Sequence, residues 1–256
     1  MSKKPKHYRT ILELPKRLYA IGDIHGCAEE LEHLLLFLKN EQKVGEEDQI
    51  IFIGDYIDRG PDSKKVVDEM LRMKREYPKT VFLMGNHEEM LLGFLGYEGT
   101  TGVAYIPNGG GTTLASYGIS GDEKPEEIRR KISPTHIEFF RTLDSCVVIE
   151  NFIFVHAGLH PLKKLDDQDY SDMHWIRNEF IYNVHNFEKT IIFGHTPFLD
   201  VLFHLPFKMG IDTGLVYGNK LSCVELTQRQ IFQIKRGETA IVVRSFDEAI
   251  KQQNES

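Results

Sequence analysis

Five short apolar runs in the sequence each end in a glycine and in polar residues of a few types. The runs are YAIGDIHG, FIGDYIDRG, FLMGNHE, FVHAG and IFGHT. A short apolar run bounded by glycine is typical of a buried strand. Because ligands bind beyond the carboxyl ends of strands in open α/β sheets, five polar strand ends predict one shared site. The chain is therefore restricted to folds that bring several strand ends together.

Helical segments separate the first three of these strands. In chain order, strands and helices are expected to alternate at 17–23, 28–42, 49–55, 63–77, 80–86 and 87–95. The helices are predicted from apolar residues at helical spacing. An alternation of strand and helix predicts parallel strands that are joined by crossover helices.

The pattern changes at residue 146 to short strands with few helices between them. Residues 146–155 predict a hairpin with its turn at Glu150 and Asn151. Further strands are expected at 190–196, 207–214, 220–227, 230–235 and 239–246. The stretch 96–145 is rich in glycine and polar residues and then charged and helical, and we interpret it as a substrate-side insertion. We expect one α/β domain, residues 1–256, with a mainly parallel first half and a hairpin-rich second half.

Charge and cysteine content limit the partners and the compartment. The net charge of −7 argues against a nucleic-acid partner, since such binding depends on Lys and Arg that neutralise phosphates. Cys27, Cys146 and Cys223 are odd in number and widely spaced, which favours free thiols in a reducing compartment. No apolar signal region follows the basic N-terminus, and the longest apolar run, 34–38, is too short to span a bilayer. We expect a cytoplasmic protein without a membrane partner; the oligomeric state stays open.

The polar residues at the strand ends form a mixed set of oxygen and nitrogen ligands. They are Asp23, His25, Asp55, Asp58, Arg59, Asn86, His87, Glu88, His156 and His195. Carboxylates, imidazoles and an amide oxygen together suit Mn, Fe, Zn or similar ions. The set is too large for one tetrahedral centre, whereas two ions about 3.5–4 Å apart would use it fully.

The order of these motifs carries a resemblance to a known family. GDIHG, GDYIDRG, GNHE, HAG and GH resemble the signature of the PPP-type serine/threonine protein phosphatases, within the calcineurin-like metallophosphoesterases. The bacterial and bacteriophage-lambda type is the most similar branch, which HWIRNEF, IIFGHTP and IDTGLVYGNKLSCVEL also resemble. The resemblance spans residues 20–226 and implies a β-sandwich of two mixed sheets flanked by helices.

The resemblance also implies a set of metal ligands. They are Asp23 and His25 for a first ion, Asp55 as the bridge, and Asn86, His156 and His195 for a second. We expect two divalent ions, with manganese first and Fe, Zn, Co or Ni as alternatives. A water that bridges two such ions is largely hydroxide near neutral pH. It could attack phosphorus directly, so no Ser or Cys nucleophile is needed.

Catalytic and substrate-binding roles are carried over in the same way. His87 would be the general acid that protonates the leaving oxygen, oriented by Asp58. Arg59, Arg177 and the side chain of Asn86 would hold the phosphoryl oxygens. An imidazolium paired with a carboxylate is a good proton donor between pH 6 and 8. The planar guanidinium of arginine matches two phosphate oxygens at once.

The main functional prediction is a phosphomonoesterase acting on phosphoserine, phosphothreonine and also phosphotyrosine in proteins. The alternative is a dinucleoside-polyphosphate hydrolase, such as one for diadenosine tetraphosphate, so the partner is a phosphoprotein or a small phosphorylated molecule. The intact Asp58-Arg59-Gly60 favours the former, and Cys27 in GDIHGC keeps the latter open. A third reading, an inactive metal-binding scaffold, would need a missing ligand or acid, and we find none missing.

Two further features are interpreted as structural. The run NGGGTT, residues 108–113, lacks the Gly-Lys-Ser/Thr ending of a phosphate-binding loop, which favours a loop that enters a helix. Glu88, His160 and His174 lie near the site in sequence, but no direct chemistry is assigned to them. Cys27 is interpreted as a small residue that opens a helix, and its sensitivity to oxidation stays open.

Overall fold

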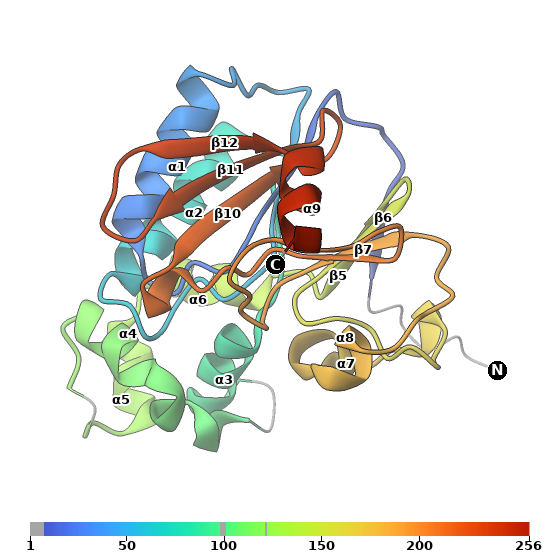
Figure 1. Ribbon diagram of the computed structural model, residues 1–256. Coiled ribbons are helices and arrows are strands. Elements are labelled where there is room, and N and C mark those ends of the chain that lie inside the picture. Colours follow the sequence, from blue (N-terminus) through green and yellow to red (C-terminus); the bar gives the residue numbers. More distant parts are fainter. Residues whose placement is uncertain (1–7, 98–100, 121, 256) are drawn as a thin grey trace.

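The computed structural model describes residues 8–97, 101–120 and 122–255, and the basic segment 1–7 lies outside them. The strands of the first sheet are β2 (Leu18–Ile21), β3 (Gln49–Phe52), β4 (Val81–Phe82), β10 (Lys220–Glu225), β11 (Gln230–Lys235) and β12 (Ile241–Ser245). Those of the second are β1 (Arg9–Ile11), β5 (Cys146–Ile149), β6 (Phe152–Val155), β7 (Thr190–Phe193), β8 (Leu202–His204) and β9 (Lys208–Gly210). Within the described residues each sheet has six strands, in the orders β12-β11-β10-β2-β3-β4 and β1-β5-β6-β7-β9-β8 (Figure 1).

Both sheets are mixed, and each contains a parallel core. β2, β3 and β4 run parallel to one another, as do β6, β7 and β9. Antiparallel hairpins join β5 to β6, β10 to β11 and β11 to β12. The predicted turn between β5 and β6 is present, with Glu150 at φ 49°. The expected α/β class is confirmed, with a parallel first half and hairpins in the second, whereas the parallel pairing of β6, β7 and β9 was not expected.

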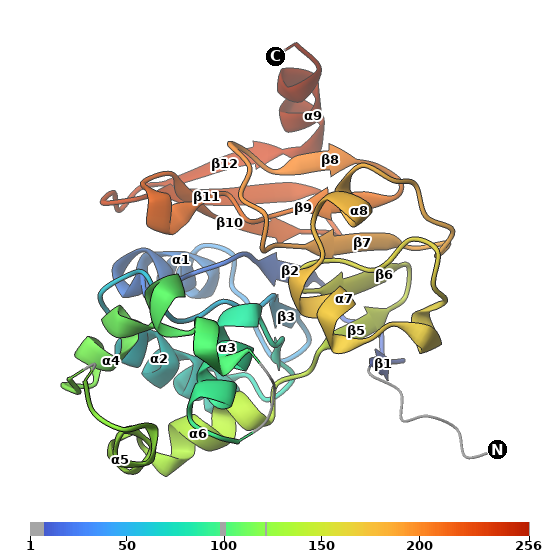
Figure 2. The same cartoon turned by 90° about the horizontal axis from the view of Figure 1, so that it is seen from below.

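Most of the helices lie outside the two sheets, whereas the last one packs Phe246 and Ala249 into the apolar layer between them. They are α1 (Ala28–Asn40), α2 (Ser63–Glu76), α3 (Asn86–Phe94), α4 (Gly111–Ser116), α5 (Pro125–Lys131), α6 (Pro134–Arg141), α7 (Tyr170–Trp175), α8 (Asn178–Ile181) and α9 (Phe246–Glu255). Figure 2 shows α7 and α8 beside β5, β6 and β7, and α3 to α6 gathered on the other side. In the described part of the chain, no helix combines the length and the apolar character needed to cross a membrane.

Alternating side chains along the strands produce three apolar layers. Leu18 and Ala20 of β2 point between the two sheets, whereas Tyr19 and Ile21 pack against the helices on the outer face. A third layer lies between the second sheet and the helices α7 and α8. This two-faced burial explains why the strands read as continuous apolar runs rather than as alternating ones.

Some elements were not expected from the sequence. They are β1, β8, α7, α8 and α9. β1 and β8 have three residues each, and α7 and α8 have six and four, which is too short to show a period. The expected strand 80–86 is also shorter than predicted: β4 ends at Phe82, and Asn86 already begins α3.

The carboxyl ends of the two parallel cores meet at one edge of the sandwich. A Cβ on Gly194, which follows β7, would lie 2.1 Å from Oδ1 of Asp23, which follows β2. A Cβ on Gly22 would lie 2.4 Å from the carbonyl oxygen of Ile211, which follows β9. Both distances are far inside van der Waals contact, so these positions require glycine. The contact brings the polar ends of both sheets into one site.

Candidate active site

Five of the polar residues at the strand ends have left-handed backbone conformations. These are His25 (φ 47°), Asp55 (52°), Asp58 (72°), Arg59 (68°) and His195 (63°). Such conformations are uncommon for residues other than glycine, and they concentrate at functional sites where the surroundings hold them in place. They turn the chain sharply at the end of each strand, so that consecutive side chains face the same space.

Glu88 holds the turn that follows β3. Its Oε1 accepts hydrogen bonds from the backbone N–H groups of Tyr56 at 2.8 Å and Ile57 at 3.3 Å. Its Oε2 accepts from those of Asp55 and Gly85, both at 3.0 Å. The side chain is fully buried, so these bonds satisfy backbone donors that water cannot reach. Glu88 thus positions Asp55, a role that the sequence did not reveal.

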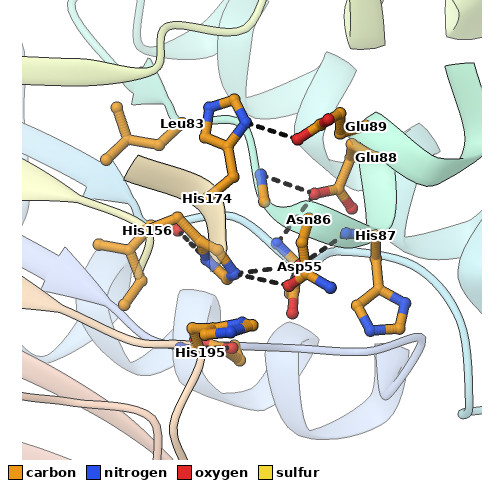
Figure 3. A network of polar contacts seen from close by, with 12 residues as sticks. Asp55, Leu83, Asn86, His87, Glu88, Glu89, His156, His174 and His195 are labelled. Atoms are coloured by element: carbon orange, nitrogen blue, oxygen red, sulfur yellow. Dashed lines mark hydrogen bonds and ion pairs between the residues drawn. The ribbon is translucent and has the colours of Figure 1, made fainter. Parts of the chain in front are cut away.

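Asp55 lies at the centre of the site. Its Oδ2 is 3.4 Å from Nε2 of His25, and its Oδ1 is 3.3 Å from Nε2 of His156. The Oδ1 of Asn86 is 3.1 Å from the same Nε2 of His156. Figure 3 shows Asn86 and His156 converging on Asp55, with His195 and His87 nearby. All of them are buried.

Hydrogen bonds fix the orientation of two imidazoles. Nδ1 of His25 lies 2.8 Å from the carbonyl oxygen of Ile57, and Nδ1 of His156 lies 2.8 Å from that of Ile53. Because a carbonyl oxygen can only accept, each Nδ1 carries the proton and each Nε2 is left to face the site. Burial lowers the pKa of His25 to about 3, which keeps this ring neutral at pH 7. A neutral imidazole with this orientation is a suitable metal ligand.

This set of ligand atoms suits metal ions, because two of the atoms have no hydrogen-bond partner. Among the described residues, Oδ1 of Asp23 and Nε2 of His195 are buried without a hydrogen-bond partner. Burial, together with the carboxylates of Asp212 and Asp55, raises the pKa of Asp23 well above its usual value. Divalent cations would satisfy the unpartnered atoms and compensate the buried negative charge.

Two groups of side chains within the described residues could each hold an ion. One consists of His25, Asp55 and His87, and the other of Asp55, His156 and His195. Asp23 lies beside the second group, since its Oδ2 accepts a hydrogen bond from the backbone N–H of His195 at 3.0 Å. Asp55 belongs to both groups, which is the arrangement expected of a bridge.

His87 and Asp58 form a buried pair. Nδ1 of His87 is 2.7 Å from Oδ2 of Asp58, and the other ring nitrogen, Nε2, is buried and unpartnered among the described residues. Burial raises the pKa of Asp58 to about 8 and lowers that of His87 to about 4. The 2.7 Å contact requires one proton between the two atoms, and burial disfavours a charge on either residue. Nε2 of His87 faces the space around Asp55, where it could hold either a proton or an ion.

Thr113 supports this pair from the segment 96–145. Its hydroxyl donates to Oδ1 of Asp58 at 2.6 Å and accepts from the backbone N–H of Asp58 at 2.9 Å. Thr113 lies in α4, so NGGGTT does enter a helix as expected, but it is not a plain loop, because 106–110 form a π-helical turn with a kink at Gly109. The backbone N–H of Arg59 donates to the carbonyl oxygen of Gly109 in that loop at 3.3 Å. No sequence signal pointed to these contacts, which join positions about fifty residues apart.

The two arginines lie at the open side of the site. Arg59 is half-buried, and its Nη1 donates to Nε2 of His25 at 2.6 Å. Arg177 is exposed, immediately precedes α8, and donates to the hydroxyl of Thr196 at 3.3 Å. Burial is the main cause of the lowered pKa of His87, and the charges of Arg59 and Arg177 add to it. Both guanidinium groups therefore act on the same space.

Asp212 is a buried carboxylate to which the sequence prediction assigned no role. It is 5% exposed, its Oδ1 accepts from the backbone N–H of Gly214 at 2.9 Å, and burial raises its pKa to about 6. A signal for it existed, because FKMGIDTG ends β9 with glycine and aspartate in the same manner as the other strand ends.

The burial and contacts of Cys27 and His174 indicate structural roles for both residues. Cys27 is 1% exposed, and burial raises the pKa of its thiol to about 12, which makes it a poor nucleophile. His174 is buried, with Nδ1 2.9 Å from Oε2 of Glu89 and Nε2 3.1 Å from the hydroxyl of Ser145. These contacts connect α7 to α3 behind the site (Figure 3).

Comparisons with known proteins support a phosphoesterase. Residues 16–231 match the family described as calcineurin-like phosphoesterase. A bis(5'-nucleosyl)-tetraphosphatase of the asymmetrical type from Oceanobacillus iheyensis is 32% identical over 238 residues, which covers 84% of this chain and 90% of the relative.

Solved structures show the same fold. One, described provisionally as a diadenosine tetraphosphatase, has a TM-score of 0.67 at 22% identity and covers 90% of this chain and 97% of that one. A cold-active protein tyrosine phosphatase has a TM-score of 0.63 at 17% identity and covers 94% of this chain and 80% of that one. At these identities the likeness concerns the fold alone.

The main functional prediction, a protein phosphatase, is wrong on these comparisons. The similar relative is named for dinucleoside tetraphosphates, which was the alternative prediction. The expected calcineurin-like superfamily is therefore confirmed, whereas the PPP branch within it is not. The prediction relied on Asp58 and Arg59. Their contacts are to His87 and His25, within the candidate site itself, and a role toward a phosphoryl group would suit protein and nucleotide substrates equally, so they could not distinguish the two.

Proposed function

Because the chain belongs to the calcineurin-like phosphoesterase family, we propose that it is a metal-dependent hydrolase of bis(5'-nucleosyl) tetraphosphates. The observation that carries the proposal is the 32% identity to an asymmetrical tetraphosphatase over 90% of that relative. The site supports it, since buried acceptors for ions adjoin two guanidinium groups. We propose asymmetrical cleavage, into a nucleoside monophosphate and a nucleoside triphosphate.

We propose that two divalent ions occupy the groups around Asp55. Their ligands would be Asp23, His25, Asp55, Asn86, His156 and His195. When bound, such ions activate a water molecule and neutralise the charge of the phosphoryl oxygens. The ligand set accepts several metals, and manganese is our first choice for loading.

His87 is proposed as the proton donor to the leaving phosphate oxygen. Its Nε2 faces the site, while Asp58 holds Nδ1 and stabilises the charged ring when it forms. Thr113 fixes Asp58 in turn. Arg59, Arg177 and the amide of Asn86 would bind the phosphoryl oxygens, and the two guanidinium groups would favour the charge that develops there.

The segment 96–145 is proposed to form the substrate side of a single domain. It contacts the site through Thr113 and Gly109, which touch Asp58 and Arg59. A polyphosphate substrate is longer than one phosphoryl group, so its distal part needs a surface beyond the metal ligands.

Product analysis tests the proposal. The purified protein, loaded with Mn²⁺, is incubated with diadenosine tetraphosphate, with a phosphopeptide panel and with p-nitrophenyl phosphate. We expect AMP and ATP from the dinucleotide, at a kcat/KM well above that for any phosphopeptide. Two molecules of ADP would refute asymmetrical cleavage. Turnover of phosphopeptides without turnover of the dinucleotide would refute the proposed substrate class.

A further inference from the structure

Tyr217 is an exposed aromatic residue at the rim of the site. It ends the short 3₁₀ helix Leu215–Tyr217, which lies between Gly214 (φ 67°) and Gly218 (φ 91°). Leu215 is 1% exposed, whereas Tyr217 is 63% exposed. The tight turn therefore buries its first side chain and leaves the tyrosine ring outside the core. Core packing does not explain an aromatic residue at this position.

Arg59 connects this ring to the site. Its Cζ lies 5.6 Å from the centroid of the Tyr217 ring, within the range of a cation–π contact. Its Nη1 lies 2.6 Å from Nε2 of His25. One guanidinium group thus spans the gap between the ring and the proposed metal ligands.

The loop that carries Tyr217 also adjoins another strand end. A Cβ on Gly214 would lie 3.6 Å from Cβ of Pro197 and 3.7 Å from Cδ2 of Tyr217. Pro197 follows His195 by two residues. The ring consequently lies between the turn after β7 and the turn after β3, both of which supply side chains to the site. This location is beside the proposed phosphate position and open to solvent.

We propose that the ring of Tyr217 is the stacking platform for the nucleobase attached to the phosphate that Arg59 holds. The inference rests on the proposed function and adds a base-recognition site to it. In a nucleoside 5'-phosphate, one ribose separates the base from the phosphate. In this protein, the guanidinium group of Arg59 separates the ring of Tyr217 from the proposed metal ligands. The nucleoside monophosphate unit is therefore the part that binds between them. Because every base has an aromatic face, the platform tolerates both purines and pyrimidines.

A pair of ligands that differ by the base tests the platform. AMP and ribose 5-phosphate are compared as inhibitors of p-nitrophenyl phosphate hydrolysis and by titration calorimetry, both on the Mn²⁺-loaded full chain. Tyr217→Ala removes the ring, Tyr217→Phe keeps it, and Tyr182→Ala removes another tyrosine that is 80% exposed. Stacking on an aromatic side chain predicts that the wild-type protein prefers AMP over ribose 5-phosphate by roughly 5- to 150-fold.

The preference for AMP decides the outcome. We expect Tyr217→Ala to abolish it, and Tyr217→Phe and Tyr182→Ala to retain it. Equal weakening of AMP and ribose 5-phosphate in Tyr217→Ala would show that the ring only steadies Arg59, and would overturn the inference. So would a wild-type protein that binds both ligands equally. Neither measurement uses diadenosine tetraphosphate, so a failure of the proposed function, seen as absent turnover of that compound, is distinguished from a failure of the platform.

Discussion

Asp55 lies between two of the other proposed metal ligands, His25 and His156. Its two carboxylate oxygens face different histidines, and its Oδ1 also accepts from the backbone N–H of His87 at 3.2 Å. One buried carboxylate therefore faces two imidazoles and a backbone N–H. Its neutralisation would leave the surrounding acceptors without a shared ion.

Asp55→Asn is expected to lose metal and activity together. Mutation of a group that only supports a ligand costs about 10- to 100-fold, and loss of a bridging carboxylate should exceed about 100-fold. Elemental analysis of the purified variant, next to its kcat/KM, checks this. Asp122→Asn, at an exposed aspartate, is the matched control. Two ions retained per chain would contradict the bridging role.

His87→Asn separates the two roles open to His87. As a general acid it should lose roughly 10²–10⁴ in kcat while keeping both ions. His87 also belongs to one of the two candidate metal groups, so a loss of one ion in the variant would identify it as a ligand instead. Metal content and kcat, measured on the same preparation, give the answer.

At the scale of elements, α3 does more than cover a sheet. Its first residues supply Asn86 and His87 to the site, and Glu88 in the same turn binds the backbone of the turn after β3. One helix start thereby fixes the relative position of two strand ends. The left-handed conformation of Asp55 depends on these bonds.

Glu88→Gln is expected to destabilise the fold through this turn. In the glutamine side chain, an NH₂ group replaces one of the two carboxylate oxygens that accept from backbone N–H groups in the wild type. An NH₂ group can only donate, so it cannot accept from them. Leaving one buried donor unsatisfied costs about 1–3 kcal/mol, and we expect at least that loss in the free energy of unfolding in urea. Glu47→Gln, at a side chain 80% exposed, should stay within about 0.5 kcal/mol of the wild type. Equal stability of the two variants would contradict the role of Glu88.

At the scale of the whole molecule, the site concentrates buried negative charge where two sheets meet. The pKa of Asp212 is raised to about 6 and that of Asp23 is raised well above its usual value, in both cases chiefly by burial. A raised folded-state pKa stabilises the fold at low pH, and this contribution is lost as the pH rises through that pKa. Bound cations favour the ionised carboxylates and oppose the loss.

The stabilisation by metal is therefore expected to grow with pH. Between pH 5.5 and pH 8, the gap in unfolding free energy between Mn²⁺-loaded and EDTA-treated protein should widen by about 1–3 kcal/mol, since each titrating group contributes up to about 1.4 kcal/mol per pH unit. Urea unfolding at the two pH values measures the gap. The same gap at both would contradict the placement of these carboxylates next to the ions.

The sequence by itself determined the strand ends and the residue types on them. Apolar runs that end in glycine and Asp, Asn or His are local patterns, so α1 to α3, the first parallel core and the side chains around Asp55 were predictable. The parallel pairing of β6, β7 and β9 was not, because those strands are far apart in the sequence. The hairpin at Glu150 was predictable for the same reason, because its turn and its strands are neighbours in the chain.

Only the tertiary structure decided which distant segments support those side chains. Thr113 reaches Asp58 from 55 positions away, and Tyr217 meets Arg59 from a loop after β9. Short elements such as β1 and α8 form because long-range packing stabilises them, not because of their own periodicity. Substrate choice belongs to the same category. The residues proposed to surround the phosphorus would suit many esters and anhydrides, whereas the rest of a substrate would meet surfaces assembled from remote segments.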